Sequence, residues 1–162
     1  MENTDKRTIL NMEIIENSRE YLDDFVRLNE EWISNYFELE QVDHDLARNP
    51  GKIIDEGGYI FIAISNGLAV GTCALFNDGN GVYELARMAV SPSSQNIGFG
   101  KSLIEVCLSK LSEICAKKVY LVSNTKLEAA ITLYRSSGFE TVFEGKHPIY
   151  ARANIVMERE FP

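Results

Sequence analysis

The segment Gln95–Ser102 contains the residue types that can hold a phosphate group. It reads Gln-Asn-Ile-Gly-Phe-Gly-Lys-Ser and lies between a β-rich run and a run with helical spacing. Gly98 and Gly100 allow the backbone to approach a ligand closely, because glycine has no Cβ. Successive N–H groups at the start of a helix can then donate to phosphate oxygens. The segment therefore predicts an anion-binding turn at the beginning of a helix.

Two common nucleotide-binding motifs do not fit this segment. The P-loop pattern GxxxxGK[ST] matches at Gly100-Lys101-Ser102, but Gln95 stands where its first glycine is required. The dinucleotide pattern GxGxxG begins at Gly98 and meets Leu103 at its third glycine. Both motifs also need a parallel βαβ setting, whereas hairpin turns precede this segment. A nucleotide hydrolase is therefore disfavoured.

The elements that position this turn follow from apolar spacing and turn residues. Asn66-Gly67 between two β-rich runs is a strong hairpin signal, because both central residues need positive φ. Gly138 suits the left-handed position that ends a helix. The order indicates an α+β fold with a single mixed, mainly antiparallel sheet flanked by helices, in one domain over residues 1–162 with 1–8 as a loose tail. The predicted elements are a strand over Ile9–Glu16, a helix after Asn17 or Ser18, a short helix capped by Asp43, strands over Tyr59–Ser65, Leu68–Phe76 and Val82–Val90, a helix from about Gly98 to Ala116, a strand over Val119–Val122, a helix opened by a Thr125-x-x-Glu128 capping box, and strands over Phe139–Phe143 and Tyr150–Glu158.

Three features together resemble the GNAT superfamily of N-acetyltransferases. The run from Val90 to Gly100 is similar to its (Q/R)xxGx(G/A) signature, including a strand that ends in Val-Ser-Pro. The run Ala129–Phe139 is similar to its A…LYxxxGF helix, and the order of elements matches along nearly the whole chain. The resemblance implies transfer of acetyl from acetyl-CoA to a primary amine of a small molecule, amino acid, peptide or protein, by direct attack in a ternary complex. The alternative is a non-catalytic acyl-CoA-binding regulatory module on the same fold.

Acetyl transfer to an amine needs a group that removes a proton and a group that protonates the leaving thiolate. Glu84 lies eleven residues before Gln95, a spacing similar to that of the catalytic glutamate in the histone-acetylating branch, so it is the candidate base, acting directly or through water. Tyr134 stands where many relatives have a tyrosine near the CoA sulfur, so it is the candidate acid. The structural alternatives are a solvated carboxylate or partner of Arg87 for Glu84, and a core aromatic residue for Tyr134.

The resemblance also implies a set of cofactor contacts. Backbone groups of Met88, Ala89 and Val90 would lie along the pantetheine arm of CoA, and Asn124 would be a further contact. Many relatives have a basic residue inside the loop, where this chain has neutral residues, so Lys101 is the expected source of positive charge. The residues implied to hold the pyrophosphate are Gln95, Asn96, Ile97, Gly98, Phe99, Gly100, Lys101 and Ser102.

The acceptor is the part of the reaction that the sequence defines least. Relatives line the acceptor site with the first helices and the last hairpin, which makes Phe37, Tyr150 and Arg152 the candidates. Tyr150, Arg152 and Asn154 would share one face of their predicted strand by two-residue alternation. Arg152 can clamp a substrate carboxylate, which would indicate an amino acid or peptide, or it can form a surface salt bridge.

Charge and cysteine content limit the partners and the compartment. The net charge of -8 disfavours nucleic acid and anionic membranes, while edge strands leave a homodimer open. Three isolated cysteines in apolar stretches, Cys73, Cys107 and Cys115, indicate buried free thiols in a reducing compartment, and no run reads as a signal peptide, so a cytoplasmic location is expected. No CxxC pair occurs and the two histidines are far apart in sequence, so no metal is expected.

Overall fold

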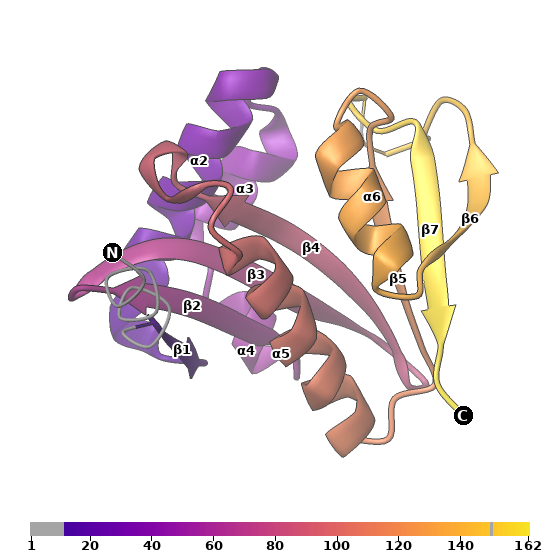
Figure 1. Ribbon diagram of the computed structural model, residues 1–162, viewed down its shortest axis with the longest axis horizontal. Coiled ribbons are helices and arrows are strands. Elements are labelled where there is room, and N and C mark those ends of the chain that lie inside the picture. Colours follow the sequence, from indigo (N-terminus) through magenta and orange to yellow (C-terminus); the bar gives the residue numbers. More distant parts are fainter. Residues whose placement is uncertain (1–11, 150) are drawn as a thin grey trace, which may run out of the picture.

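The computed structural model describes residues 12–149 and 151–162, which form a mixed sheet with helices on both faces (Figure 1). The strand order over these residues is β1-β2-β3-β4-β5-β7-β6, and β4–β5 is the parallel pair among otherwise antiparallel neighbours. This confirms the α+β prediction. The strands are β1 Met12–Glu16, β2 Tyr59–Ser65, β3 Leu68–Gly79, β4 Val82–Val90, β5 Lys118–Ser123, β6 Glu140–Glu144 and β7 Ile155–Glu160. The helices are α2 Leu22–Tyr36, α3 Gln41–Arg48, α4 Lys52–Asp55, α5 Phe99–Glu113 and α6 Glu128–Ser136, with 3-10 turns η1 Arg19–Tyr21 and η2 Pro92–Ser94.

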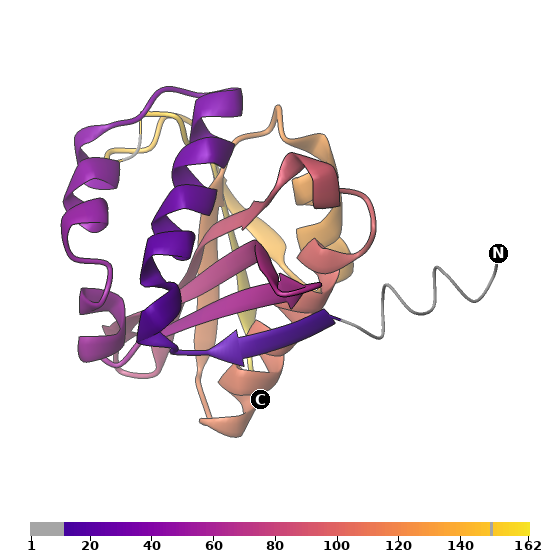
Figure 2. The ribbon, with the colours of Figure 1, turned by 90° about the vertical axis from the view of Figure 1, so that its left-hand side faces the viewer.

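Strand alternation divides the core between the two faces of the sheet. On β2, Ile60, Ile62 and Ile64 pack with Phe25 of α2. Phe61 and Ala63 point to the opposite face, where α5 and α6 supply a second apolar cluster. Figure 2 shows α2, α3 and α4 on one side of the sheet and α5 and α6 on the other. The buried strand β2 therefore fixes both layers against the same sheet.

The hairpin prediction at Asn66-Gly67 is confirmed, and the next turn is shorter than predicted. Asn66 and Gly67 both have positive φ, of 52° and 78°. Strand β3 continues to Gly79 rather than ending at Phe76, so the connection to β4 is the two-residue turn Asn80-Gly81. Both turn residues again have positive φ, which matches the twist of the flanking strands.

Two predicted helix caps are wrong. Helix α3 begins after Glu40, and Asp43 is its third residue, where the carboxylate accepts a hydrogen bond from the Glu40 backbone N–H at 2.8 Å. The Thr125-x-x-Glu128 capping box does not form, because α6 begins at Glu128. The Thr125 hydroxyl and backbone N–H bind the Asn154 side chain instead. At Thr125 a contact remote in sequence replaces the local one, whereas Asp43 still takes part in a local cap, as the third residue of the helix.

Three further boundaries also differ from the sequence prediction. Strand β7 begins at Ile155, so Arg152 and Asn154 lie in the connection before it and do not share a strand face. Tyr150 and the predicted tail over residues 1–8 lie outside the described residues. Helix α5 ends at Glu113, and Cys115 lies beyond it in a left-handed conformation with an exposed side chain, so it is not a buried helical thiol.

The site is positioned by a gap in the middle of the sheet. Strands β4 and β5 pair only at Val82–Glu84 with Lys118–Tyr120, although β4 continues to Val90. Beyond Glu84 the two strands diverge, as Figure 1 shows above their shared lower end. A β-bulge lies on β4 in this region, where Arg87 has a φ of 58°. The divergence exposes one edge of β4 to the space between the two halves of the sheet.

No helix within residues 12–149 and 151–162 has the length and apolar character that crossing a membrane requires.

Candidate active site

A cleft of about 770 Å³ occupies the gap between β4 and β5. One wall comes from α2 and the residue after it, and the opposite wall comes from the turn before α5 and from α6. The exposed part of β4 forms the floor, and Arg152 and Ala153 lie at one end. Residues from β4, the glycine turn, the helix of Tyr134 and the connection before β7 therefore meet in one space.

The glycine turn forms the cleft wall at the start of α5. Asn96 and Gly98 have positive φ of 64° and 95°, and α5 begins directly after Gly98. The first N–H that bonds back is that of Ser102, to the Gly98 carbonyl at 3.0 Å, so the N–H groups of residues 99–101 have no partner within the helix. Phe99 is buried and anchors the turn in the core. The geometry suits the oxygens of a pyrophosphate.

Helix α6 brings Tyr134 to the same cleft. The small residues Ala129 and Ala130 face the cleft one turn earlier and leave room beside it. The Tyr134 ring packs edge-on against Phe139 with centroids 6.0 Å apart. Burial, together with the nearby Cys73 and Cys107 thiols, raises the pKa of Tyr134 well above its usual range. The phenol therefore carries its proton at any physiological pH.

Glu84 lies on β4 at the point where β5 diverges. The residue is 7% exposed, and its Oε2 atom is buried without a hydrogen-bond partner in the described part of the chain. Burial, with the negative charge of Asp78, raises the pKa of Glu84 to about 7, although Arg87 opposes this shift. The carboxyl can therefore exchange a proton near neutral pH. The predicted structural alternative, a pair with Arg87, does not form, because Arg87 binds Asp43.

Asp43 holds two arginines, Arg87 and Arg152, that line the cleft. Its carboxylate accepts hydrogen bonds from Arg152 at 2.8 and 2.9 Å, from Arg87 and from the Glu40 backbone N–H. The Glu40 carboxylate binds Arg152 as well, at 2.9 Å. Burial would raise the pKa of Asp43, but the hydrogen bonds from Arg152, the Glu40 N–H and Arg87 hold this pKa well below its usual range. The cluster ties α3, β4 and the connection before β7 into one wall.

Aromatic side chains from the end of α2 also line the cleft. The Trp32 ring lies 5.0 Å from that of Tyr36 and 6.2 Å from that of Phe37, measured between centroids. The Lys126 ammonium lies 3.9 Å from the Phe37 ring centroid and donates to the Tyr36 carbonyl at 3.1 Å. Lys126 therefore ties the loop before α6 to the aromatic group formed by Trp32, Tyr36 and Phe37.

Most of the predicted site residues line the cleft, and a few do not. Of the predicted cofactor contacts, Ala89, Ile97 and Ser102 are absent from the lining, and the Ile97 side chain is half exposed. The Asn124 side chain faces the cleft, but its amide donates to the Arg152 carbonyl and accepts from the Lys126 N–H. The predicted residues that do line the cleft are Phe37, Glu84, Met88, Val90, Gln95, Asn96, Gly98, Phe99, Gly100, Lys101, Asn124, Tyr134 and Arg152.

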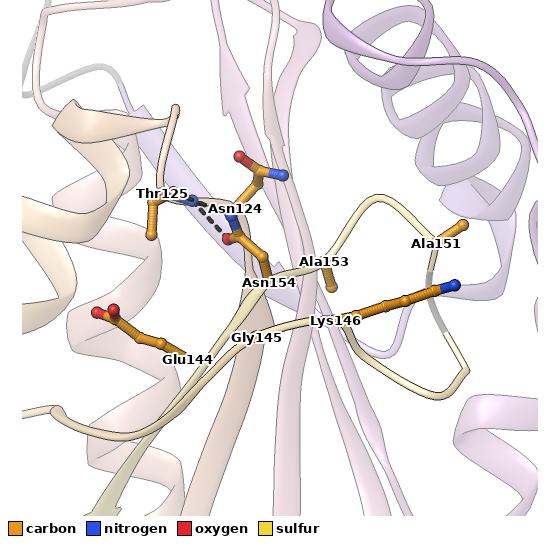
Figure 3. A pocket seen from close by; sticks show the side chains of 8 residues that line it. All are labelled: Asn124, Thr125, Glu144, Gly145, Lys146, Ala151, Ala153 and Asn154. Atoms are coloured by element: carbon orange, nitrogen blue, oxygen red, sulfur yellow. Dashed lines mark hydrogen bonds between the residues drawn. The ribbon is translucent and has the colours of Figure 1, made fainter.

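A second hollow of about 530 Å³ adjoins the cleft across the connection before β7 (Figure 3). Asn124 and Ala153 line both spaces. Thr125 and Asn154 close one end through their hydrogen bonds, and Glu144 and Lys146 come from β6 and the loop after it. The predicted base and acid do not line this hollow. Among the described residues no group of three or more His, Cys, Asp or Glu side chains is arranged to hold a metal ion.

The comparison with known proteins identifies the class of this fold and cleft. A GNAT-family acetyltransferase from Staphylococcus aureus Mu50 superposes with a TM-score of 0.82 at 24% identity, over 92% of this chain and 98% of that chain. The PaiA N-acetyltransferase from Thermoplasma acidophilum, solved in complex with coenzyme A, superposes with a TM-score of 0.72 at 18% identity, over 93% of this chain and 99% of that one. The fold is that of the GNAT acetyltransferases.

Sequence comparison gives the same family. Residues 19–139 match the profile of the Acetyltransferase (GNAT) family. The chain is also 28% identical over 125 residues to an uncharacterized N-acetyltransferase of Schizosaccharomyces pombe, a match that covers 74% of this chain and 77% of that protein. The chain therefore belongs to the GNAT family of acetyltransferases.

Proposed function

We propose that this protein transfers the acetyl group of acetyl-CoA to a primary amine, by direct attack within a ternary complex. One observation carries the proposal: a buried carboxyl with an unpartnered oxygen and a phenol that keeps its proton face the same cleft as the glycine turn. Acetyl-CoA would supply the acetyl group as an activated thioester. The complex of the PaiA relative with coenzyme A supports this donor.

The donor would be held by main-chain groups. The N–H groups at the start of α5 would bind its pyrophosphate, and Lys101, which lines the cleft, would add positive charge. The free edge of β4 near Met88 and Val90 would pair with the amides of the pantetheine arm. An N–H group there would donate to the carbonyl oxygen of the acetyl group. The Cβ-free backbone at Gly98 and Gly100 keeps the turn open for this approach.

Glu84 would accept the proton of the attacking amine, directly or through a water molecule. A lysine-type amine has a pKa near ~10.4, so about one molecule in a thousand is neutral at pH 7.4. A base with a pKa of about 7 is well matched to this task, because it is substantially ionised near neutral pH and still holds a proton firmly. Tyr134 would donate a proton to the leaving thiolate, since its raised pKa keeps the phenol protonated at neutral pH.

The cysteines support transfer without an acetylated enzyme. Cys73 and Cys107 are fully buried, and burial raises the pKa of the Cys107 thiol well above its usual range. A thiol attacks an acetyl group as the thiolate, so the Cys107 thiol would be a poor acetyl carrier. Cys115 is exposed but does not line the cleft.

Kinetics of two variants test the proposal. We expect Glu84→Gln to lower kcat/KM by about 10²–10⁴-fold and to abolish the rise of wild-type activity with pH through about 7. Tyr134→Phe keeps the ring against Phe139 and should lower kcat. Thiol release from acetyl-CoA and the mass of the acetylated amine are measured together. Glu13→Gln and Tyr21→Phe, at positions outside the cleft, are the matched controls. Donor binding with no turnover in wild type, for any amine, would indicate the regulatory module instead.

A further inference from the structure

The acceptor end of the cleft has a chemical character of its own, apart from the donor-binding turn. This inference rests on the proposed function. We infer that the acceptor is a primary amine on an aromatic or other flat apolar body, with no carboxylate beside the amine. The inference is based on the two arginines paired with carboxylates, the unpartnered oxygen of Glu84 and the aromatic group of α2.

The two arginines at this end are already matched by carboxylates. Both oxygens of Asp43 accept two hydrogen bonds each, and Glu40 adds a second carboxylate to Arg152. Two guanidinium groups therefore meet two carboxylates, and the cluster has no net charge. The Arg87 and Asp43 side chains are 9% and 3% exposed, so water does little to screen this pairing. A substrate carboxylate at this end would have to compete with Asp43 and Glu40 for the same donors.

Two polar side chains of the cleft lining offer hydrogen-bond acceptors. Glu84 presents its carboxyl, with one oxygen unpartnered. Asn29 lines the cleft and is 6% exposed; its Nδ2 donates to the Phe25 carbonyl at 2.9 Å, and its amide oxygen is a hydrogen-bond acceptor. A charged amine has hydrogen-bond donors and no acceptor, so it can bind both the Glu84 carboxylate and the Asn29 oxygen. A carboxylate placed between them would be repelled by Glu84 and could not bind the Asn29 oxygen.

The body of the acceptor would lie against the aromatic group of α2. Trp32, Tyr36 and Phe37 all line the cleft, and their rings are within contact distance of one another. Flat apolar molecules gain burial and ring stacking on such a surface. Lys126, which also lines the cleft, turns its ammonium to the Tyr36 carbonyl and the Phe37 ring, so it serves to fix the aromatic group.

A paired substrate panel tests this inference. Tryptamine, tyramine and phenethylamine are compared with tryptophan, tyrosine and phenylalanine, which differ from them only by the carboxylate, and with the corresponding amino-acid amides. We expect kcat/KM for each amine to exceed that of its amino acid at least about tenfold, with the amides between the two. Trp32→Ala should raise KM for tryptamine more than for propylamine. Phe143→Ala, an aromatic truncation at an exposed position outside the cleft, should change neither value.

Variants of the arginine cluster test separately whether Asp43 and Glu40 exclude a substrate carboxylate. Glu40→Gln removes one carboxylate from Arg152, and Asp43→Asn removes the shared one. The first variant is included because the second leaves two part-buried arginines without this partner, which destabilises the fold. Each should raise the activity ratio of tryptophan to tryptamine above the wild-type value. Amino acids or free peptides that match or exceed the amines in wild type would overturn the inference while leaving acetyl transfer intact. Failure of every amine, with donor bound, would overturn the proposed function as well.

Discussion

At the scale of single residues, the properties that make Glu84 the proposed base are costly for stability. Its position at the end of the β4–β5 pairing buries the carboxyl and leaves one oxygen without a partner in the described chain. Burial is what raises the pKa of Glu84 to about 7, so the property that suits a base arises from an unfavourable environment for its charged form. Such conflicts are typical of functional sites.

This conflict predicts that Glu84→Gln stabilises the protein in a pH-dependent way. Folding raises the pKa of Glu84 from 4.5 to about 7, so the contribution of this group to stability is full below pH 4.5 and is lost as the pH rises through about 7. Glutamine has no charge to bury. The advantage of the variant in free energy of unfolding should therefore grow by about 2 kcal/mol between pH 5 and pH 8, measured by urea denaturation. The exposed change Glu13→Gln should show no such growth, and a constant difference for Glu84→Gln would contradict the buried-charge explanation.

At the scale of elements, the junction of η2, the glycine turn and α5 would couple the fold to the proposed donor binding. Gly98 has a φ of 95°, and a Cβ built there meets no atom within 4 Å. Any L-residue at this position is thus strained by the backbone and not by crowding. The turn can therefore be perturbed without disturbing the packing of Phe99 beneath it.

Gly98→Ala and Gly67→Ala separate donor binding from backbone strain. Gly67 also has a positive φ, of 78°, and an open Cβ position, but it lies in the β2–β3 hairpin away from the cleft. Both variants should lose about 1 kcal/mol of stability. Only Gly98→Ala should weaken CoA binding, by about tenfold or more, because the N–H groups of residues 99–101 are displaced. Equal CoA affinities in the two variants, measured by calorimetry, would show that the turn does not hold the donor.

At the scale of the whole molecule, the sequence was most informative where the chemistry is local. The glycine turn, the Asn66-Gly67 hairpin and the Tyr134 helix depend on neighbouring residues, and the structure has each of them in place. The arginine cluster could not be predicted, because Asp43 lies 44 residues from Arg87 and 109 from Arg152. The sequence pattern there supported a helix cap for Asp43 and, for Arg152, either a carboxylate clamp or a surface salt bridge.

The same distinction explains the misplaced start of β7 and the aromatic group. Tyr150–Glu158 has strand composition, but the Asn154 side chain binds Thr125, and its segment is used to close the loop before α6. Trp32 and Tyr36 follow the helical spacing of α2, so spacing alone does not mark them as cleft residues. They acquire that position because β4 and β5 diverge next to α2, which is a property of the assembled sheet.

Calorimetric titration of acetyl-CoA, CoA and ATP into the protein tests the central claim most directly. ATP shares the adenine nucleotide and phosphates of CoA but lacks the pantetheine arm that the free edge of β4 would bind. We expect both CoA species to bind one per chain with about micromolar Kd and ATP not to bind under the same conditions. Absence of binding by both CoA species would contradict the account and reduce the glycine turn to an ordinary connection between a strand and a helix.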